Sequence, residues 1–270
     1  MSTATPATLA RPRPVSDTLT MFRRSLLHNL RNPTGPIMAI VGGIVILLLF
    51  VYVFGGTLGA GLVAGGTRSD YLAYITPSIM LMGGVGIMQM ISVWVSMDMS
   101  EGIIARFRTM AIARSSVLAG HAYSGIVLVI IAAFPLLGFA VLLGYRPHAD
   151  GPQWLGLVGF ILLLAIALSW LAVAFGLASR RVENASNLPL VVLILPMVSS
   201  GFVPVASFPA GLREFAQYQP FTPIINTLRG LLAGQATAST AWSAIGWLLG
   251  IAVVGYAWSL WLYRRRATVR

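Results

Sequence analysis

The chain has 270 residues, of which 57% are hydrophobic and only 9% carry a charge. A soluble globular domain carries about 25% charged residues, so this composition all but excludes a soluble globular enzyme. The formal net charge of +11 comes from 18 basic residues, all of them arginine, against 7 acidic ones. The absence of cysteine excludes disulfides and thiolate metal sites.

The N-terminal region predicts a disordered tail over 1–14 and an amphipathic elbow helix over 15–33. Apolar residues recur at every third or fourth position, at Val15, Leu19, Phe22, Leu26 and Leu30. On a helical wheel they fall within an arc of about 80°, opposite Arg24, His28 and Arg31. A basic amphipathic helix of this kind lies flat in the headgroup layer of a membrane. The pattern leaves open whether it also contacts a cytoplasmic partner.

Six uncharged stretches follow, and each is long enough for one membrane crossing, which takes about 20 apolar residues. The stretches are continuously apolar and do not alternate, which favours helices over a β-barrel. Proline interrupts the fifth stretch at three positions, so it is the least regular. The predicted spans are 37–58, 75–97, 117–143, 154–178, 188–207 and 241–263.

The arginines orient these spans, because arginine next to a span favours the cytoplasmic side. With six spans, four arginines fall on the outer side, and the other 14 fall on the side of the two termini. The sequence therefore predicts that both termini are cytoplasmic and that 264–270 is a basic cytoplasmic tail. The four outer arginines are Arg68, Arg146, Arg213 and Arg229.

The loop between the second and third spans, residues 98–116, is itself amphipathic. Arg106 and Arg108 flank its apolar face, and Asp98 and Glu101 stand where the N-terminus of a helix favours negative charge. Such a helix suits docking into a groove of another protein. A solvated basic loop explains the pattern equally well. The apolar face consists of Ile103, Ile104, Phe107, Met110 and Ala111.

The sequence lacks the residues that would let this chain drive transport by itself. No predicted span contains a charged residue, whereas ion-coupled carriers usually keep ionisable groups in the bilayer. Without lysine the chain has no phosphate-binding loop of the usual kind, so we expect it to bind no nucleotide. The histidines are scattered, at His28, His121 and His148, which indicates no metal site. Energy for uphill transport would have to come from a partner.

The second span is rich in methionine and glycine, with six of the 11 methionines between Met80 and Met99. Methionine adapts to irregular surfaces, so this helix is a candidate wall for a substrate path, although ordinary helix packing is the favoured interpretation. Proline in the fifth span predicts a kink that frees backbone carbonyls. The candidate path residues are Met82, Met88, Gln89 and Pro196.

Three stretches carry a resemblance to a known family: Phe22–Pro33, Glu101–Arg114 and Gln219–Gly234. On these the chain resembles the membrane subunits of the type-2 permease superfamily of ABC transporters. Within it, the chain is most similar to the daunorubicin/doxorubicin-resistance-type exporter permeases of actinobacteria. One departure is Gln219-Pro220, which stands where Asn-Pro is common.

The resemblance implies an all-α integral membrane fold with six transmembrane helices, a coupling helix in the 98–116 loop and partly re-entrant outer helices over 210–234. It implies two permease chains, identical or homologous, on two separate ATPase subunits, which bind ATP and Mg. The residues expected to contact the ATPase are Glu101, Gly102, Arg106, Phe107 and Arg108. The residues expected to make the elbow-helix contacts are Phe22, Arg23, Arg24 and Arg31.

The sequence therefore predicts the permease subunit of an ATP-driven exporter in the bacterial plasma membrane, moving a hydrophobic or amphiphilic substrate out of the cell. We expect it to be no enzyme itself, to contact membrane lipid and to bind no nucleic acid. Alternatives are an ABC exporter of polysaccharide or lipid-linked cargo, or an ion-coupled secondary carrier. A membrane enzyme would show a polar catalytic cluster at one interface, and the sequence shows none.

Overall fold

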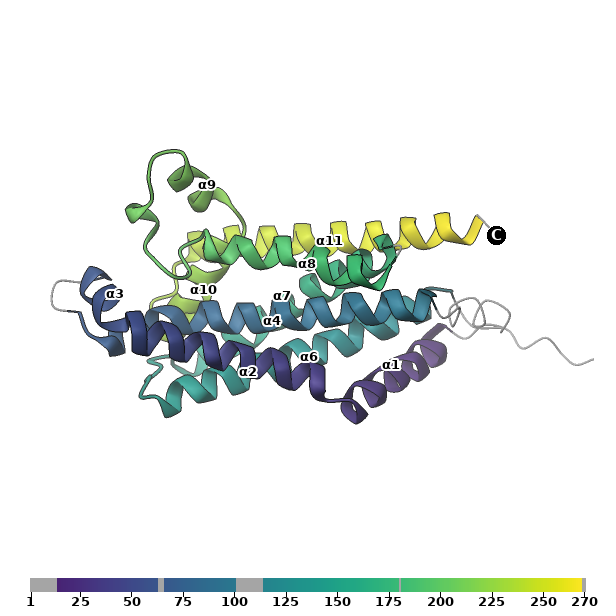
Figure 1. The fold of residues 1–270 in the computed structure, drawn as a ribbon, viewed down its shortest axis with the longest axis horizontal. Coiled ribbons are helices and arrows are strands. Elements are labelled where there is room, and N and C mark those ends of the chain that lie inside the picture. The colour runs from purple at the N-terminus through teal and green to yellow at the C-terminus, as the bar shows by residue number, and fades with distance from the viewer. Residues whose placement is uncertain (1–13, 63–65, 101–113, 180, 269–270) are drawn as a thin grey trace, which may run out of the picture.

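The computed structural model describes residues 14–62, 66–100, 114–179 and 181–268, and this part of the chain is all-helical with no strands. Figure 1 shows long helices running side by side along the long axis of the molecule. One end carries α1 and the last turn of α4, and we call it the α1 end. The opposite end carries α9 and is called the α9 end. The all-helical architecture predicted from the sequence is confirmed.

The described helices follow one another in chain order from α1 to α11. Helix α2 continues through a π-helical turn, Phe50–Phe54, into α3, and a 3₁₀ turn at Val205–Ser207 precedes α9. The bounds are α1 Pro14–Arg31, α2 Thr34–Leu49, α3 Gly55–Leu62, α4 Arg68–Ser100, α6 Arg114–Leu142, α7 Gly151–Ala178, α8 Val182–Met197, α9 Leu212–Tyr218, α10 Phe221–Ala233 and α11 Ala238–Thr268.

Five helical stretches in the described residues are long and apolar enough to cross a membrane. They overlap the first, second, third, fourth and sixth predicted spans. The helix over the sixth predicted span differs at its end, because α11 continues to Thr268 and takes in most of the predicted tail. The five stretches are Thr34–Leu62, Arg68–Ser100, Ser116–Leu142, Gly151–Ala178 and Ala238–Arg265.

The fifth predicted span, 188–207, differs more clearly from the structure. Its helix, α8, begins at Val182 and ends at Met197 after 16 residues. At 1.5 Å per residue this gives about 24 Å, less than the ~30 Å hydrocarbon core. Pro189 and Pro196 lie inside α8 and donate no backbone hydrogen bond, and the chain leaves the helix directly after the second. Residues 198–202 continue as turns.

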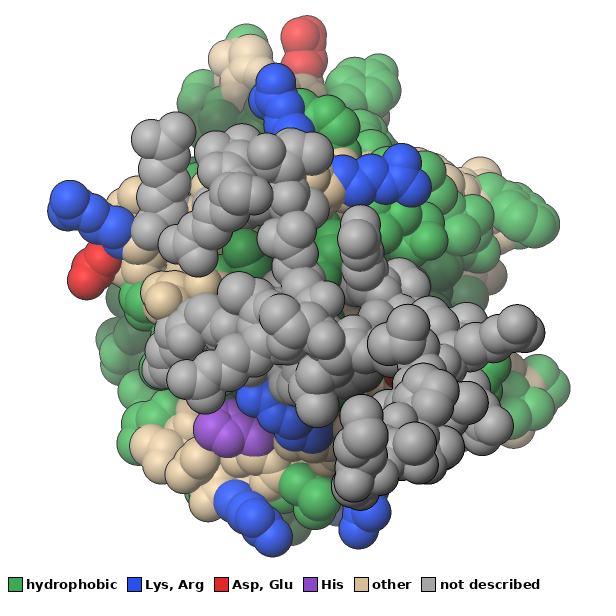
Figure 2. Space-filling model, turned by 90° about the vertical axis from the view of Figure 1, so that its right-hand side faces the viewer, with side chains coloured by type: hydrophobic (Ala, Val, Ile, Leu, Met, Phe, Trp, Pro, Cys, Tyr) green, Lys and Arg blue, Asp and Glu red, His purple; other side chains and the backbone are tan. Residues whose placement is uncertain are grey.

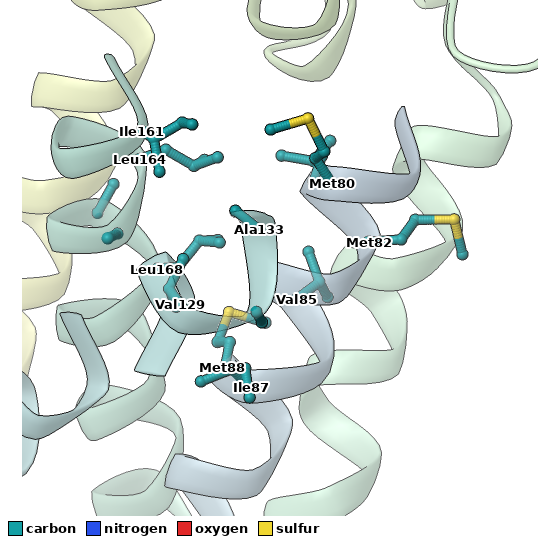
Figure 3. Packing of buried hydrophobic residues seen from close by; sticks show 14 of the residues in the cluster. Met80, Met82, Val85, Ile87, Met88, Val129, Ala133, Ile161, Leu164 and Leu168 are labelled. Carbon is teal, nitrogen blue, oxygen red and sulfur yellow. The ribbon is translucent and has the colours of Figure 1, made fainter. Parts of the chain in front are cut away.

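Helix α4 lies at the centre of the bundle and packs against α2, α6, α7, α8 and α10. Small residues allow its backbone to approach its neighbours closely. A Cβ atom at Gly176 of α7 would lie 2.6 Å from the backbone oxygen of Ser92, and one at Gly83 would overlap Leu136. Figure 3 shows the packing of Met88, Val129 and Leu168 in this region. The core is therefore built around α4.

The contact between α4 and α7 predicts that Gly176→Ala destabilises the fold. The added methyl group meets backbone, so we expect a cost of about 1–3 kcal/mol and a fall of several degrees in the apparent melting temperature. Gly159→Ala is the matched control, because Gly159 lies on the same helix with open space around its Cβ position. Thermal unfolding of detergent-purified protein, followed by tryptophan fluorescence, measures both. Equal melting temperatures for the two variants would contradict the close contact.

Candidate functional site

At the α1 end, helix α1 packs against α6 through a face of small and polar residues. Thr18 donates to the hydroxyl of Ser116 at 3.0 Å, and the hydroxyls of Ser25 and Ser124 lie 2.8 Å apart. A Cβ atom at Gly120 would lie 2.8 Å from the carbonyl carbon of Met21, so the two backbones nearly touch. Close approach and paired hydroxyls hold α1 in place.

The predicted apolar stripe of α1 lies on a different face from these contacts. Val15, Leu19 and Leu30 are 84%, 64% and 54% exposed, while Phe22 and Leu26 are half-buried. The periodicity identified the stripe but not the face that packs, because the packing face consists of residues that no hydropathy pattern selects. The apolar stripe therefore remains available to a lipid surface.

Asp98 joins three helices at this end. Its carboxylate accepts from Nε2 of His121 on α6 at 3.1 Å and from Nη1 of Arg24 on α1 at 3.5 Å. The sequence analysis placed Asp98 at the N-terminus of a helix, and this is corrected by the structure, because α4 continues to Ser100 and Asp98 lies in its last turn. A carboxylate is unfavourable there, and the two basic partners offset this. Sequence reasoning missed the cluster because its members come from separate helices.

The predicted site residues at this end are only partly described. Of the elbow-helix residues, Arg24 binds Asp98, Phe22 is half-buried, and Arg23 and Arg31 are exposed. The predicted coupling residues lie in the segment that follows α4, outside the described residues. They are Glu101, Gly102, Arg106, Phe107 and Arg108.

The candidate substrate-path residues lie in the core around α4 and α8. Met82 and Met88 are buried and point to different sides of α4 (Figure 3). Gln89 donates to the backbone oxygen of Ser186 at 2.8 Å and so links α4 to the first turns of α8. Pro196 is buried near the end of α8. The four residues thus make separate contacts within the helix bundle.

At the α9 end, α4 binds the segment that follows α8. Three side chains at helical spacing donate to three consecutive carbonyls, those of residues 200, 201 and 202. Tyr74 donates to Ser200 at 2.7 Å, Ser78 to Gly201 at 2.8 Å and Tyr71 to Phe202 at 3.1 Å. Positions 71, 74 and 78 lie on one face of a helix, so a single face of α4 satisfies this stretch of backbone.

Arg229 of α10 completes this arrangement. Its guanidinium donates to the carbonyl of Tyr74 at 3.1 and 3.2 Å, to the carbonyl of Ser200 at 2.9 Å and to the side-chain oxygen of Asn226 at 2.7 Å. Its Cζ also lies 3.8 Å from the centre of the Tyr74 ring. We call Tyr74, Ser200, Asn226 and Arg229 the Arg229 clamp.

The Arg229 clamp holds the charge of a half-buried arginine against carbonyl oxygens and an aromatic face. Burial lowers the pKa of Arg229, yet a guanidinium stays protonated in proteins. Its fixed fork of donors can bridge α4, α10 and the segment after α8 at once. The sequence pattern indicates Arg229 only as an outer charge, because its contacts depend on where α10 packs.

The protein is a multi-pass membrane protein. It has long apolar helices, an amphipathic first helix, and polar side chains that are hydrogen-bonded between the helices. The model of the family described as ABC-2 type transporter matches residues 16–233, from α1 to the end of α10, and the chain belongs to this family. It is therefore a transporter membrane subunit, as its resemblance implied.

Curated relatives agree with this assignment at low identity. The chain is 27% identical over 231 residues to the daunorubicin resistance ABC transporter permease protein DrrB1 of Streptomyces coeruleorubidus, covering 84% of this chain and 78% of the relative. It is 26% identical over 254 residues to the probable doxorubicin resistance ABC transporter permease protein DrrC of Mycobacterium tuberculosis, covering 94% of this chain and 90% of the relative.

The Arg229 clamp predicts that Arg229→Gln destabilises the protein by about 1–3 kcal/mol, because the carbonyls of Tyr74 and Ser200 and the side chain of Asn226 lose a charged donor. Arg213→Gln is the matched control: Arg213 is exposed and donates only to the nearby Phe208 carbonyl, so we expect less than about 0.5 kcal/mol. Thermal unfolding in detergent compares the two. If Arg229→Gln and Arg213→Gln have the same melting temperature, the clamp contributes nothing to stability.

The contact of α1 with α6 predicts that Gly120→Val displaces α1. The chain has no native cysteine, so Thr18→Cys with Ser116→Cys reports the distance between the helices by disulfide formation. We expect efficient cross-linking in the otherwise unchanged protein and a loss of most of it with Gly120→Val. Gly138→Val is the control on the same helix, since Gly138 has open space around it. Unchanged cross-linking in Gly120→Val would rule out the close approach.

Proposed function

We propose that this chain is the membrane subunit of an ATP-driven exporter that moves a hydrophobic or amphiphilic compound out of the cell. The match to the ABC-2 type transporter family over residues 16–233 carries the proposal. The names of the relatives, which concern resistance to daunorubicin and doxorubicin, support this class of substrate. The sequence has no lysine for a phosphate-binding loop, so ATP and Mg would bind to a separate subunit.

In this proposal the ATPase docks on the loop 98–116. The support from the described residues is the position of the two helices that the loop connects. Helix α4 ends at Ser100 and α6 begins at Arg114. The Asp98 cluster ties these helices to each other and to α1. A displacement of the loop by the ATPase would therefore act on α4 and on α1 together.

The α1 end faces the cytoplasm of a bacterial cell in this proposal. Figure 2 shows this end, with arginine side chains around its rim. Arginine next to membrane spans is enriched on the cytoplasmic side, which supports this orientation. The exposed apolar stripe of α1 would lie in the inner headgroup layer. The proposed position is the plasma membrane, with both termini inside.

The proposed assembly contains two permease chains and two ATPase subunits. Helices α2 and α11 leave most of their apolar surface uncovered within this chain. This surface supports contact with lipid or with a second permease chain, identical or homologous. The candidate path residues Met82, Met88, Gln89 and Pro196 would line the route of the substrate when the packed helices separate.

Reconstitution tests the proposed energy source. We expect ATP-dependent uptake of doxorubicin into inside-out vesicles that contain this chain and its partner ATPase subunit, and no uptake with either protein alone. Doxorubicin fluorescence measures uptake, and a catalytically dead ATPase is the control. Uptake by this chain alone under an ion gradient would overturn the proposal in favour of a secondary carrier.

The proposed docking surface predicts that Phe107→Asp abolishes copurification with the ATPase, because a charge would be buried where an apolar side chain should dock. Phe215→Asp is the matched control: Phe215 is an exposed phenylalanine of α9, at the opposite end of the molecule. We expect the control variant to keep its partner. Equal recovery of the ATPase with both variants would contradict docking on the loop 98–116.

A further inference from the structure

A cavity of about 150 Å³ lies between α1, α4 and α6 at the α1 end. This is the volume of an engineered protein cavity that binds benzene, so it has room for a small organic group. Arg24 and His28 are exposed at its mouth, and Asn29, Trp94, Asp98 and His121 form its walls. A second hollow, which shares Arg24 and His28, adds the basic side chain of Arg31. The cavity thus opens onto a basic surface.

The side chain of Asn29 lacks hydrogen-bond partners among the described residues. The residue is only 1% exposed and lines the cavity, yet neither its side-chain nitrogen nor its side-chain oxygen has a hydrogen-bond partner in the described part of the chain. Leaving a buried polar group unsatisfied costs about 1–3 kcal/mol. The neighbouring Ser25 bonds Ser124. A ligand that both accepts and donates hydrogen bonds would satisfy the amide of Asn29.

The charges around the cavity narrow the class of ligand. Arg24 supplies a guanidinium and Asp98 a carboxylate, and the 3.5 Å between them exceeds the 2.7–2.9 Å of a tight charge-assisted bond. A zwitterion can engage both groups at once, with its anion toward Arg24 and its cation toward Asp98. The rings of His28 and Trp94, with centroids 6.0 Å apart, give the cavity an aromatic wall.

The surroundings indicate a lipid as the source of the zwitterion. The apolar stripe of α1 is exposed, and Trp94 lines the cavity, where a tryptophan fits the aromatic belt of a membrane interface. We propose that the cavity binds the phosphoethanolamine headgroup of an inner-leaflet lipid. Arg24 and the side-chain nitrogen of Asn29 donate to its phosphate, while Asp98 and the side-chain oxygen of Asn29 accept from its ammonium group. The bound lipid holds α1 against α4 and α6 beside the loop 98–116.

Native mass spectrometry of the full chain in detergent tests this site. The probes are phosphatidylethanolamine, phosphatidylcholine, which has no ammonium N–H, and phosphatidylglycerol, which has no ammonium group, all with the same acyl chains. We expect phosphatidylethanolamine to be retained roughly tenfold more than either, the ratio that one charge-assisted hydrogen bond supplies. Equal retention of phosphatidylcholine or phosphatidylglycerol would overturn the proposal, and this comparison needs no variant.

Variants of Asn29 test whether the lipid binds in this cavity. Asn29→Leu has a similar volume and removes both hydrogen-bonding groups, so it should reduce phosphatidylethanolamine retention to the level of phosphatidylcholine. Asn187→Leu is the matched control, since Asn187 is exposed on α8. Retention equal to the unmodified protein in Asn29→Leu would exclude this cavity. Melting temperatures of both variants verify that they fold.

A third arm separates a lipid from a soluble ligand of the same chemistry. Free O-phosphoethanolamine should displace the lipid only at far higher concentration, because it lacks acyl chains, and displacement at equal concentration would overturn the lipid assignment. The site rests on the proposed orientation of the α1 end, but no ATPase or transport enters the measurement. Its failure is therefore distinguishable from failure of the proposed function.

Discussion

Backbone carbonyls at the end of α8 impose the constraint on which the α9 end of the molecule depends. A backbone polar group that is buried away from water needs a partner within the protein, because leaving it unpaired costs free energy, and residues 199–202 are buried. Helix α8 ends at Met197, and the carbonyls that follow have no helical donors. Gln219 donates to the carbonyls of Leu195 and Val198, each at 3.0 Å. The α4 side chains and Arg229 satisfy those of residues 200–202. The position of α10 follows from this requirement.

Helix α4 carries polar bonds along its whole length, and this makes it the link between the two ends. It binds the segment after α8 through Tyr71, Tyr74 and Ser78 and the start of α8 through Gln89 and Ser92. At its last turn, Asp98 holds α1 and α6. A displacement at the α1 end would therefore act on the Arg229 clamp through one continuous helix.

Sequence patterns predicted the long helices well, because continuous apolar stretches and proline positions are local properties. The same patterns were less informative where two local signals compete. The fifth span was drawn as one apolar run to residue 207, whereas Pro196 and the Ser199-Ser200-Gly201 stretch end the helix at Met197. Asp98 was assigned to the start of a helix, whereas α4 extends past it to Ser100. Both differences concern helix ends, where a few hydrogen bonds determine whether the helix continues.

The sequence by itself determined an all-helical multi-pass membrane protein without a phosphate-binding loop, because composition, apolar length and the absence of lysine need no knowledge of contacts. Only the tertiary structure decided which residues meet. Arg229 reaches Tyr74 across 155 positions of sequence, and Asp98 meets Arg24 across 74. Asn29 lies between His28 and Leu30 on a helix whose hydropathy pattern shows only the apolar stripe, so only packing shows that Asn29 is buried. Side-chain partners of this kind depend on the distances between helices, which hydropathy does not encode.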